Sequence, residues 1–599
     1  MSRPRKWAQQ ACAPTLKHTL VAATLGVAAV GGAQDQYQVV FENNVAMKTR
    51  DGVTLRADIY RPKADGKFPV LLQRTPYDKY QLGGINFGLR AAARGYVCII
   101  QDVRGRNASE GEWYPFKYES QDGYDAVEWA AALPYANGKV GMFGLSYIGA
   151  TQMLAAMASP PHLAGIFPII TASNYYGHWV YQGGAFEQLF NQAWCSALAV
   201  HELGRRAGGT ALPTYWDLKR PSTEYPLLEP GPAKGLAGYY FDWIAHPAYD
   251  DYWKQWSIEE HFDKITVPAL HLAAWYDIFL DGSLRNYAGI KRQGGSAAAR
   301  QGQRLVVIPG GHAGVGPKLG EIDFGKDSVL DSWELGLRWY DHLLKGIDNG
   351  MAREKPVRIF VMGKNVWRDE DDWPLARARP TRYYLHSEGK ANTLSGDGRL
   401  SLAPPTSSAA SARASEPADK YVYDPDDPTP TQGGALIGGP PGPLDQRAVE
   451  SRSDVLVYTT PAFEQDTEVT GPVSLELYVS SSAVDTDFTG KLVDVWPNGF
   501  AQNLTDGILR MRYRNSMEKA ELMNPGEVYK VTIDLWSTAN VFLAGHKLRL
   551  EIASSNFPRF DRNPNTGGGP ESSAAHIPAT NVIHHDQDHP SALIVPIVP

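Results

Sequence analysis

The chain has 599 residues, a formal net charge of -7 and a pI near 6.1, so its overall charge gives no basic footprint for nucleic acid. Its length predicts two or three domains, each with a sizeable buried core. It contains only three cysteines, which excludes a fold held together by a disulfide framework. These properties describe a globular protein and leave its chemistry open.

The first 33 residues have the layout of a secretory signal. Basic residues between positions 3 and 17 precede an apolar run over 20–30, and Gly31-Gly32-Ala33 offers a small-residue cleavage site. The apolar run is too short to span a bilayer. We therefore expect a secreted or periplasmic mature protein, with no membrane partner after cleavage and with Cys98 and Cys195 as its only cysteines.

From residue 34 to residue 172, β-type and helical runs alternate. Asp51-Gly52 lies between two β-type runs and predicts a hairpin at the start of this region. The alternation that follows predicts βαβ units and a mostly parallel sheet covered on both faces. The expected strands are 70–73, 97–101, 140–143 and 164–170, and the expected helices are 87–93, 123–132 and 148–158.

The alternation stops at residue 173 and resumes at residue 265. Residues 173–264 are aromatic-rich, with helix-prone stretches at 187–203 and 248–261 on either side of a Pro/Gly-rich stretch at 221–238. An insertion of this kind over a parallel sheet is typical of a helical cap that walls a pocket. Over 265–354 we expect strands 269–274 and 304–308 and helices 280–291 and 329–344.

The last segment, 355–599, contains many short β-type runs without helices, which predicts a β-sandwich or jelly roll. The predicted fold class is therefore α/β, a doubly wound sheet with a helical cap insertion and a C-terminal all-β domain. Near the end, the run His584–His589 is rich in histidine and aspartate. Its residues are consecutive rather than at metal-ligand spacing, so we interpret it as a solvated loop and predict no metal site.

Ser146 is the candidate nucleophile. It stands between an expected strand and an expected helix in Gly144-Leu145-Ser146-Tyr147-Ile148-Gly149, the strand–turn–helix context of a nucleophile elbow. Gly144 lets the strand and the helix pack closely, but the usual second glycine is absent at 148 and appears at Gly149. The motif is therefore incomplete when taken alone.

A serine hydroxyl needs a base and an acid that orients the base, and in doubly wound hydrolases the order is Ser, Asp or Glu, then His. Asp277 directly follows the expected strand 269–274, and His312 follows 304–308. Asp281 and Asp263 compete with Asp277, but neither directly follows a strand. The order and the strand-end positions favour a Ser146, His312, Asp277 triad.

Acyl transfer also needs donors for the developing oxyanion. The backbone N–H of Tyr147, the residue after the nucleophile, is one expected donor. The second is expected in the loop 74–79, where the residues alone leave a backbone N–H and the Tyr77 hydroxyl as alternatives.

Several motifs in register resemble the X-prolyl dipeptidyl-peptidase and cocaine-esterase family of serine hydrolases, which includes acyl esterases, glutaryl-cephalosporin acylases and α-amino-acid ester hydrolases. They cover nearly all of the chain after the signal: Arg74-Thr75-Pro76-Tyr77, Gln101-Asp102-Val103-Arg104-Gly105, Gly144-Leu145-Ser146-Tyr147, Trp275-Tyr276-Asp277, Gly311-His312, Asp487-Phe488-Thr489, Arg510-Met511-Arg512-Tyr513-Arg514 and Ser554-Ser555-Asn556-Phe557-Pro558.

The resemblance implies an α/β-hydrolase core, a helical cap and a C-terminal jelly roll. It also implies the triad Ser146, Asp277 and His312, with the Tyr77 hydroxyl and the Tyr147 N–H as the oxyanion hole. Members similar to α-amino-acid ester hydrolases carry acidic residues just after the catalytic aspartate to bind the substrate ammonium. Here Ile278-Phe279-Leu280 stands there, which favours an uncharged or aromatic acyl group.

For the acyl pocket we expect Trp275, Tyr276 and Phe279 beside Asp277, and Trp179 from the cap. The predicted function is an exported serine hydrolase that cleaves esters or amides of small acyl substrates through an acyl-enzyme, without cofactor or metal. The alternatives are an X-prolyl dipeptidyl-peptidase, a β-lactam acylase or α-amino-acid ester hydrolase, and a non-catalytic carbohydrate-binding protein. The sequence is compatible with a homo-oligomer and predicts no nucleic-acid partner.

Overall fold

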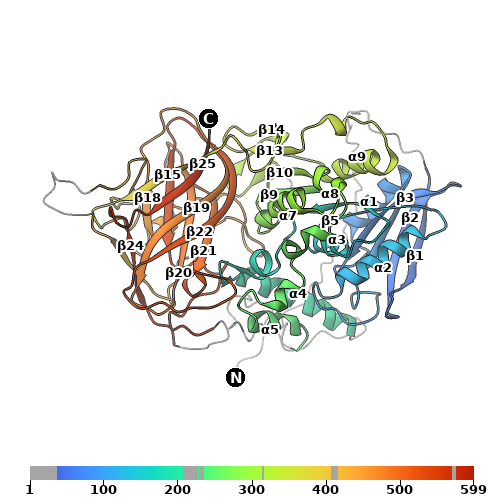
Figure 1. Ribbon diagram of the computed structural model, residues 1–599, viewed down its shortest axis with the longest axis horizontal. Helices are drawn as coiled ribbons and strands as arrows, with labels where there is room; N and C mark the ends of the chain where they lie inside the picture. Colours follow the sequence, from blue (N-terminus) through green and yellow to red (C-terminus); the bar gives the residue numbers. More distant parts are fainter. Residues whose placement is uncertain (1–36, 207–226, 228–234, 313–315, 407–415, 570–574) are drawn as a thin grey trace, which may run out of the picture.

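The structure is a computed structural model that describes residues 37–206, 227, 235–312, 316–406, 416–569 and 575–599. The expected signal, 1–33, lies outside the described residues, as does most of the Pro/Gly-rich stretch 221–238. Figure 1 shows an α/β part and an all-β part side by side, the latter formed by the orange and red end of the chain. In the described residues, no helix is long and apolar enough to cross a membrane.

The α/β part is built on a ten-stranded sheet, as counted over the described residues. Its central strands are parallel, as the alternating pattern predicts, and the first two strands form the expected antiparallel hairpin. In spatial order the strands are β1 (Val39–Lys48), β2 (Thr54–Pro62), β4 (Val97–Asp102), β3 (Phe68–Thr75), β5 (Ala136–Leu145), β6 (Leu163–Ile169), β9 (Leu270–Tyr276), β10 (Arg304–Gly311), β13 (Val357–Val361) and β14 (Val366–Glu370).

Helices cover both faces of this sheet. On one face, Val70 and Leu72 of β3 share an apolar core with α2 (Glu119–Ala131), α3 (Tyr147–Met157) and α7 (Leu280–Gln293). On the other face, Leu71 packs with α1 (Leu82–Ala93) and α9 (Ser332–Lys345). Successive side chains of a strand point to opposite faces, so the central strands supply apolar side chains to both cores. Toward their carboxyl ends, β3 and β4 also bury polar side chains, among them Gln73, Arg74 and Asp102.

The cap lies between β6 and β9 in the chain. Its longest helix, α4 (Gln188–Arg206), agrees with the expected stretch 187–203, while 248–261 contains only the short α6 (Asp251–Lys254) and a 3₁₀ helix (Ile258–Lys264). The sequence interpretation missed α5 (Gly238–Ala245) and the small hairpin of β7 (Tyr181–Gln182) and β8 (Ala185–Phe186).

The C-terminal part is all-β apart from short helical turns such as α10 (Arg447–Glu450). Its strands form one hydrogen-bonded set around a separate apolar core. They are β15 (Arg379–His386), β16 (Arg399–Ser401), β17 (Asp419–Tyr423), β18 (Leu456–Thr459), β19 (Thr467–Ser481), β20 (Asp487–Val495), β21 (Ala501–Arg510), β22 (Tyr529–Phe542), β23 (Lys547–Ala553), β24 (Ala579–His584) and β25 (Ala592–Val598).

The all-β domain is expected from residue 355, and the two strands that follow this residue belong to the first sheet. β13 pairs in parallel with β10, and β14 pairs with β13, so both strands extend the first sheet rather than the all-β set. In this register Leu305 of β10 lies opposite Val357 of β13, and both side chains are buried.

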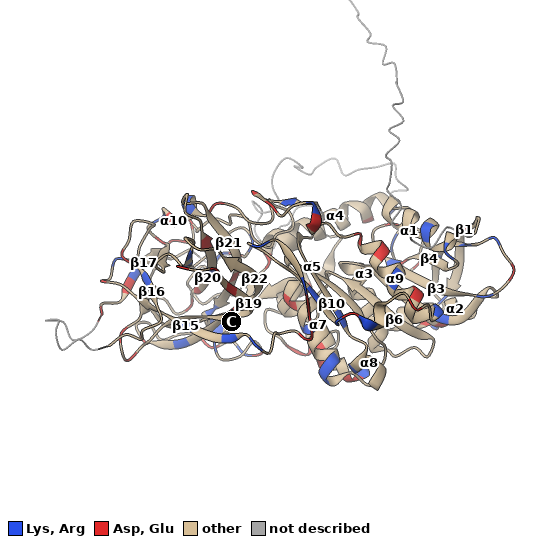
Figure 2. Cartoon of the chain, turned by 90° about the horizontal axis from the view of Figure 1, so that it is seen from above, with Lys and Arg blue, Asp and Glu red and all other residues tan. Residues whose placement is uncertain are grey.

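Charged residues of both signs are interspersed along both parts of the molecule, as Figure 2 shows.

Candidate active site

Ser146 stands at the turn between β5 and α3 in a conformation that few residues other than glycine adopt, with φ 62° and ψ -128°. Gly144 is required there, because a Cβ on it would lie 2.3 Å from Cγ2 of Ile148. A Cβ on Gly149 would lie 2.7 Å from Cβ of Thr171. The close approach therefore falls at 144 and 149, which explains why isoleucine is accepted at 148.

The structure brings Ser146, His312 and Asp277 together, although Ser146 lies 166 residues and Asp277 lies 35 residues before His312 in the chain. Nε2 of His312 lies 3.0 Å from Oγ of Ser146, and Nδ1 lies 2.7 Å from Oδ2 of Asp277. The parallel register places Gly311 opposite Tyr276, so the residues after β9 and β10 emerge side by side. The Asp277 side chain is fully buried, and its Oδ1 accepts a hydrogen bond from the Phe279 N–H at 2.7 Å.

Tyr77 lies beside the same serine. Its hydroxyl oxygen accepts a hydrogen bond from Nε1 of Trp194 at 3.1 Å and has the Ser146 side chain as its other hydrogen-bonding neighbour. Burial raises the pKa of Tyr77 to about 12, so the hydroxyl is protonated at neutral pH. Since Trp194 occupies a lone pair of the oxygen, the Tyr77 proton is free to be donated toward Ser146.

Tyr147 is the first residue of α3. The first N–H groups of a helix have no partner within the helix, so its N–H is available to an acceptor above Ser146. The Tyr147 side chain points into the protein instead, where its hydroxyl donates to Oε1 of Glu119 and accepts from the N–H of Phe116.

Phe279, which follows β9, lies against His312, and aromatic rings of the cap pack on Phe279. Phe279 packs edge-to-face on the His312 ring at 5.3 Å and stacks on Trp179 at 4.5 Å. Phe190 and Trp194 are four residues apart and therefore lie on one face of α4, and both rings pack on Trp179. Phe279 and Trp179 are buried whereas Trp194 is partly exposed, so Trp194 is the ring most open to a ligand. Phe190 was missed, and only its helical spacing from Trp194 could have identified it.

Trp275 and Tyr276 lie elsewhere, contrary to the expectation that they line the acyl pocket. Nε1 of Trp275 donates to the carbonyl of Phe360 on β13 at 2.8 Å. The Tyr276 hydroxyl donates to the carbonyl of Asn503 on β21 at 3.0 Å, so it joins the sheet to the all-β part. Adjacency to Asp277 in the chain does not bring them to the site, because both hydrogen bonds direct their side chains elsewhere.

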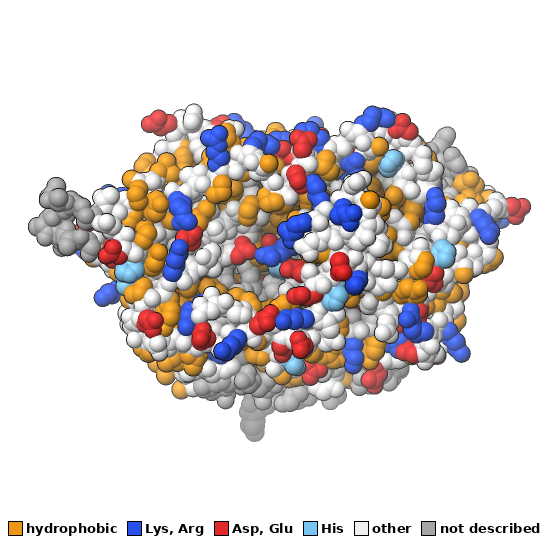
Figure 3. Space-filling model, viewed as in Figure 1, with side chains coloured by type: hydrophobic (Ala, Val, Ile, Leu, Met, Phe, Trp, Pro, Cys, Tyr) orange, Lys and Arg blue, Asp and Glu red, His pale blue; other side chains and the backbone are white. Residues whose placement is uncertain are grey.

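Asp281 is paired with a histidine and an arginine. Oδ2 of Asp281 lies 2.9 Å from Nε2 of His178 and 2.5 Å from Nε of Arg285. Burial raises the pKa of this carboxyl, but His178 and Arg285 outweigh burial and lower the pKa to about 2. Arg285 also lies 3.4 Å from Asp534 of β22, so the cluster joins the cap, α7 and the all-β part. Figure 3 shows charged side chains around a hollow in this central region.

A second serine, histidine and aspartate meet in the all-β part. They involve His585, which departs from the solvated loop expected over 584–589, whereas Gln587 and Asp588 of that segment are exposed. His585 is buried, and its Nε2 lies 3.1 Å from Oγ of Ser387 and 3.0 Å from Oδ2 of Asp419. Its Nδ1 contacts Glu416 at 3.2 Å. Burial lowers the pKa of His585, but the two carboxylates outweigh burial and raise it. A carboxylate lies against each nitrogen of this imidazole, and Oγ of Ser387 donates to Oδ2 of Asp419 at 2.6 Å, so the serine proton is directed to the carboxylate rather than to the histidine.

The mostly parallel sheet, the elbow after β5 and the side chains that follow β9 and β10 define the class of protein, an α/β hydrolase. Residues 51–314 match the X-Pro dipeptidyl-peptidase (S15) family, and residues 349–594 match the X-Pro dipeptidyl-peptidase C-terminal non-catalytic domain. The chain is 38% identical over 583 residues to the cocaine esterase of Rhodococcus sp. (strain MB1 Bresler), covering 93% of this chain and 98% of the relative. The chain belongs to the X-prolyl dipeptidyl-peptidase and cocaine-esterase family of serine hydrolases, which confirms the resemblance seen in its motifs.

Solved structures give the same fold. An α-amino acid ester hydrolase superposes with a TM-score of 0.78 at 24% identity, covering 97% of this chain and all of the other. An aminopeptidase from a marine sediment archaeon, Thaumarchaeota archaeon, superposes with a TM-score of 0.79 at 24% identity, covering 96% of this chain and 99% of the other. The expected fold class, including the C-terminal all-β domain, is therefore confirmed.

Proposed function

We propose that this serine hydrolase is exported and cleaves esters, and amides, of small uncharged acyl groups through an acyl-enzyme on Ser146. The observation that carries the proposal is the position of His312, which bridges Oγ of Ser146 and the buried Asp277 through its two different nitrogens. Export is supported by the order of basic, apolar and small residues over 1–33.

In the proposed mechanism, Nε2 of His312 takes the Ser146 proton as Oγ attacks the acyl carbon, and Asp277 stabilises the imidazolium that forms. The oxyanion accepts hydrogen bonds from the Tyr77 hydroxyl and the Tyr147 N–H. His312 then gives its proton to the leaving group, and a water activated by the same histidine releases the acyl group. The Ser146 proton thus leaves with the first product, and a proton that His312 takes from the water restores the Ser146 hydroxyl as the acid is released, so the step balances without a metal or cofactor.

Tyr77→Phe tests the oxyanion role. Loss of one preorganised donor is expected to lower kcat by about 100- to 1,000-fold, or about 2.7 to 4 kcal/mol, with little change in KM. Tyr80→Phe is the control, since the Tyr80 side chain is exposed in the same loop. A Tyr77→Phe enzyme with kcat within threefold of wild type would exclude the hydroxyl as a donor.

The nature of the acyl group follows from the surroundings of His312. Aromatic rings offer an apolar surface, and the first acidic side chain after Asp277 is Asp281, which is engaged by His178 and Arg285. An ammonium group placed against these rings would lose its hydration without gaining a carboxylate of its own.

A matched substrate pair tests this point. The p-nitrophenyl ester of phenylacetic acid differs from that of phenylglycine only by an α-ammonium, and we expect the uncharged ester to have a kcat/KM at least about tenfold higher. Faster cleavage of the phenylglycyl ester, or rapid release of free-amine X-Pro from anilides, would instead establish an ammonium site. Glycan binding without turnover of any ester or amide would support a binding protein.

A further inference from the structure

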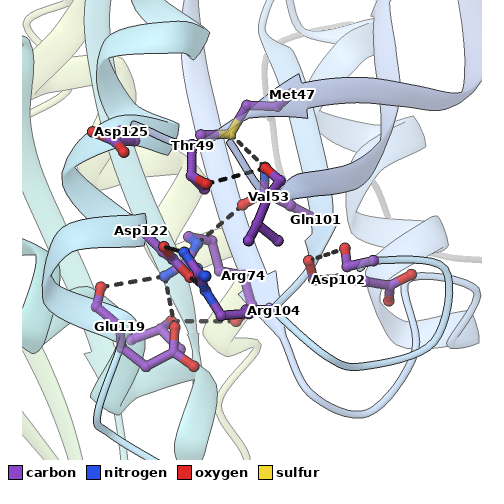
Figure 4. A network of polar contacts seen from close by, with 12 residues as sticks. Met47, Thr49, Val53, Arg74, Gln101, Asp102, Arg104, Glu119, Asp122 and Asp125 are labelled. Atoms are coloured by element: carbon purple, nitrogen blue, oxygen red, sulfur yellow. Dashed lines mark hydrogen bonds and ion pairs between the residues drawn. The ribbon is translucent and has the colours of Figure 1, made fainter. Parts of the chain in front are cut away.

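Beneath the elbow lies a network of charged side chains, which Figure 4 shows from close by. Within this network, Glu119 contacts both Arg74 and Tyr147. Glu119, the first residue of α2, is 3% exposed, and its Oε2 lies 2.7 Å from Nη1 of Arg74. Its Oε1 accepts a hydrogen bond from the Tyr147 hydroxyl at 3.0 Å.

These two partners belong to the two halves of the proposed oxyanion hole. Tyr147 supplies one donor through its own backbone N–H, and Arg74 lies three residues before Tyr77, which supplies the other. The Tyr147 hydroxyl is fixed from a second side by the N–H of Phe116 at 2.8 Å. Oγ1 of Thr151 on α3 donates to the Arg74 carbonyl at 3.2 Å, so the two halves also meet directly.

The rest of the network does not make this bridge. Arg104 forms a two-point ion pair with Asp122, at 2.9 and 2.7 Å, and reaches Asp51 at the surface. Asp122 approaches Arg74 only to 3.9 Å. Figure 4 shows Glu119 and Asp122 on the same helix. Of these two, it is Glu119 that contacts both Arg74 of β3 and Tyr147 of α3.

We propose that Glu119 is a positioning residue of the hydrolytic reaction: its carboxylate ties the Tyr147 ring to the Arg74 side chain so that the Tyr147 N–H and the Tyr77 hydroxyl converge on one oxyanion. The inference rests on the proposed function. Catalytic donors must be held to within about 0.5 Å by supporting contacts, and a single carboxylate shared by both halves sets their separation. The contacts act on the oxyanion in the transition state, so they bear on kcat more than on KM.

Glu119→Gln and Tyr147→Phe test the hydrogen bond between Glu119 and Tyr147 by changing one partner at a time. A glutamine that accepts from the Tyr147 hydroxyl presents its NH₂ group to the Arg74 guanidinium, where two donors face each other. Tyr147→Phe keeps the ring and the backbone N–H and removes only the hydroxyl, so it covers the case in which Glu119→Gln leaves Arg74 too poorly paired to fold. Each variant is expected to lower kcat about tenfold with KM unchanged, a fraction of the cost of deleting a donor.

Tyr96→Phe is the matched control. The Tyr96 hydroxyl is also buried and donates to a carboxylate, Oδ1 of Asp341, at 2.7 Å, but it lies in the core on the other face of the sheet. We expect a similar fall in melting temperature and an unchanged kcat. Because Glu119→Gln and Tyr147→Phe break the same contact, the kcat of the double variant is expected to be no lower than that of the slower single variant. Adding Tyr96→Phe to Tyr147→Phe is expected to leave kcat at the value of Tyr147→Phe alone.

The outcomes separate this inference from the proposed function. If folded Glu119→Gln and Tyr147→Phe enzymes both keep kcat within twofold of wild type while Ser146→Ala is inactive, the positioning role is overturned and the serine chemistry stands. If Tyr96→Phe lowers kcat as much as Tyr147→Phe, the effect is one of general stability and the inference is also overturned. If Ser146→Ala is fully active, the proposed function fails.

Discussion

Replacing Ser146 with alanine is expected to lower kcat for p-nitrophenyl esters by about a million-fold, because it removes the hydroxyl that lies 3.0 Å from Nε2 of His312 and would form the acyl-enzyme. Substrate binding should persist, since the rings around His312 are unchanged. Kinetic measurement of kcat, together with mass spectrometry of the protein after mixing with ester, would follow both turnover and the acyl adduct.

Ser387→Ala is the control for this experiment, because Ser387 also lies beside a histidine and an aspartate. In that cluster Ser387 and Asp419 contact the same nitrogen of His585, and Glu416 contacts the other. Near Ser146 the serine and the acid contact different nitrogens of His312, which leaves a lone pair for the serine proton. We therefore expect full activity in Ser387→Ala. Activity lost there and kept in Ser146→Ala would reverse the assignment of the nucleophile.

The positions of Ser146, Asp277 and His312 could be predicted from the sequence because each follows a strand of the parallel sheet. In such a sheet the carboxyl ends of neighbouring strands share one edge, so chain order and strand boundaries are sufficient to place them. The ring of Phe279 was also within reach of this reasoning, since it lies two residues after Asp277.

Side-chain direction could not be predicted in the same way. Trp275 and Tyr276 lie next to Asp277 in the chain, yet their hydrogen bonds are to carbonyls on β13 and β21. Likewise, β13 has the composition of any short strand, and only its pairing with β10 assigns it to the first sheet. Each of these facts depends on a partner more than 50 residues away, which one sequence does not reveal.

The burial of His585 illustrates the same limit for charged residues. A run of histidine and aspartate is usually solvated, but Asp419, 166 residues earlier in the chain, pairs with His585 in the interior. Glu119 is comparable, since nothing in its local sequence indicates that it contacts both Arg74 and Tyr147. Buried charges are placed by their partners, and the partners are distant in sequence.

Asp277→Asn is expected to lower kcat by about 10,000-fold through the tautomer of His312. The Phe279 N–H donates to one oxygen of Asp277, so an asparagine would keep its oxygen there and turn its NH₂ group toward Nδ1 of His312. Nδ1 would then have to accept a hydrogen bond, and the ring proton would move to Nε2, facing Ser146. A histidine in that tautomer cannot take the serine proton, and kcat measured on the phenylacetyl ester reports the loss.

Asp281→Asn distinguishes this effect from a general loss of negative charge near the site. Asp281 pairs with His178 and Arg285, and it joins the cap to α7 without contacting His312. Its replacement should lower the melting temperature, because Arg285 loses a buried partner, and should change kcat by no more than a fewfold. If Asp281→Asn reduced kcat as severely as Asp277→Asn, the orienting acid would not be Asp277 alone, since the tautomer of His312 depends only on the group that contacts Nδ1.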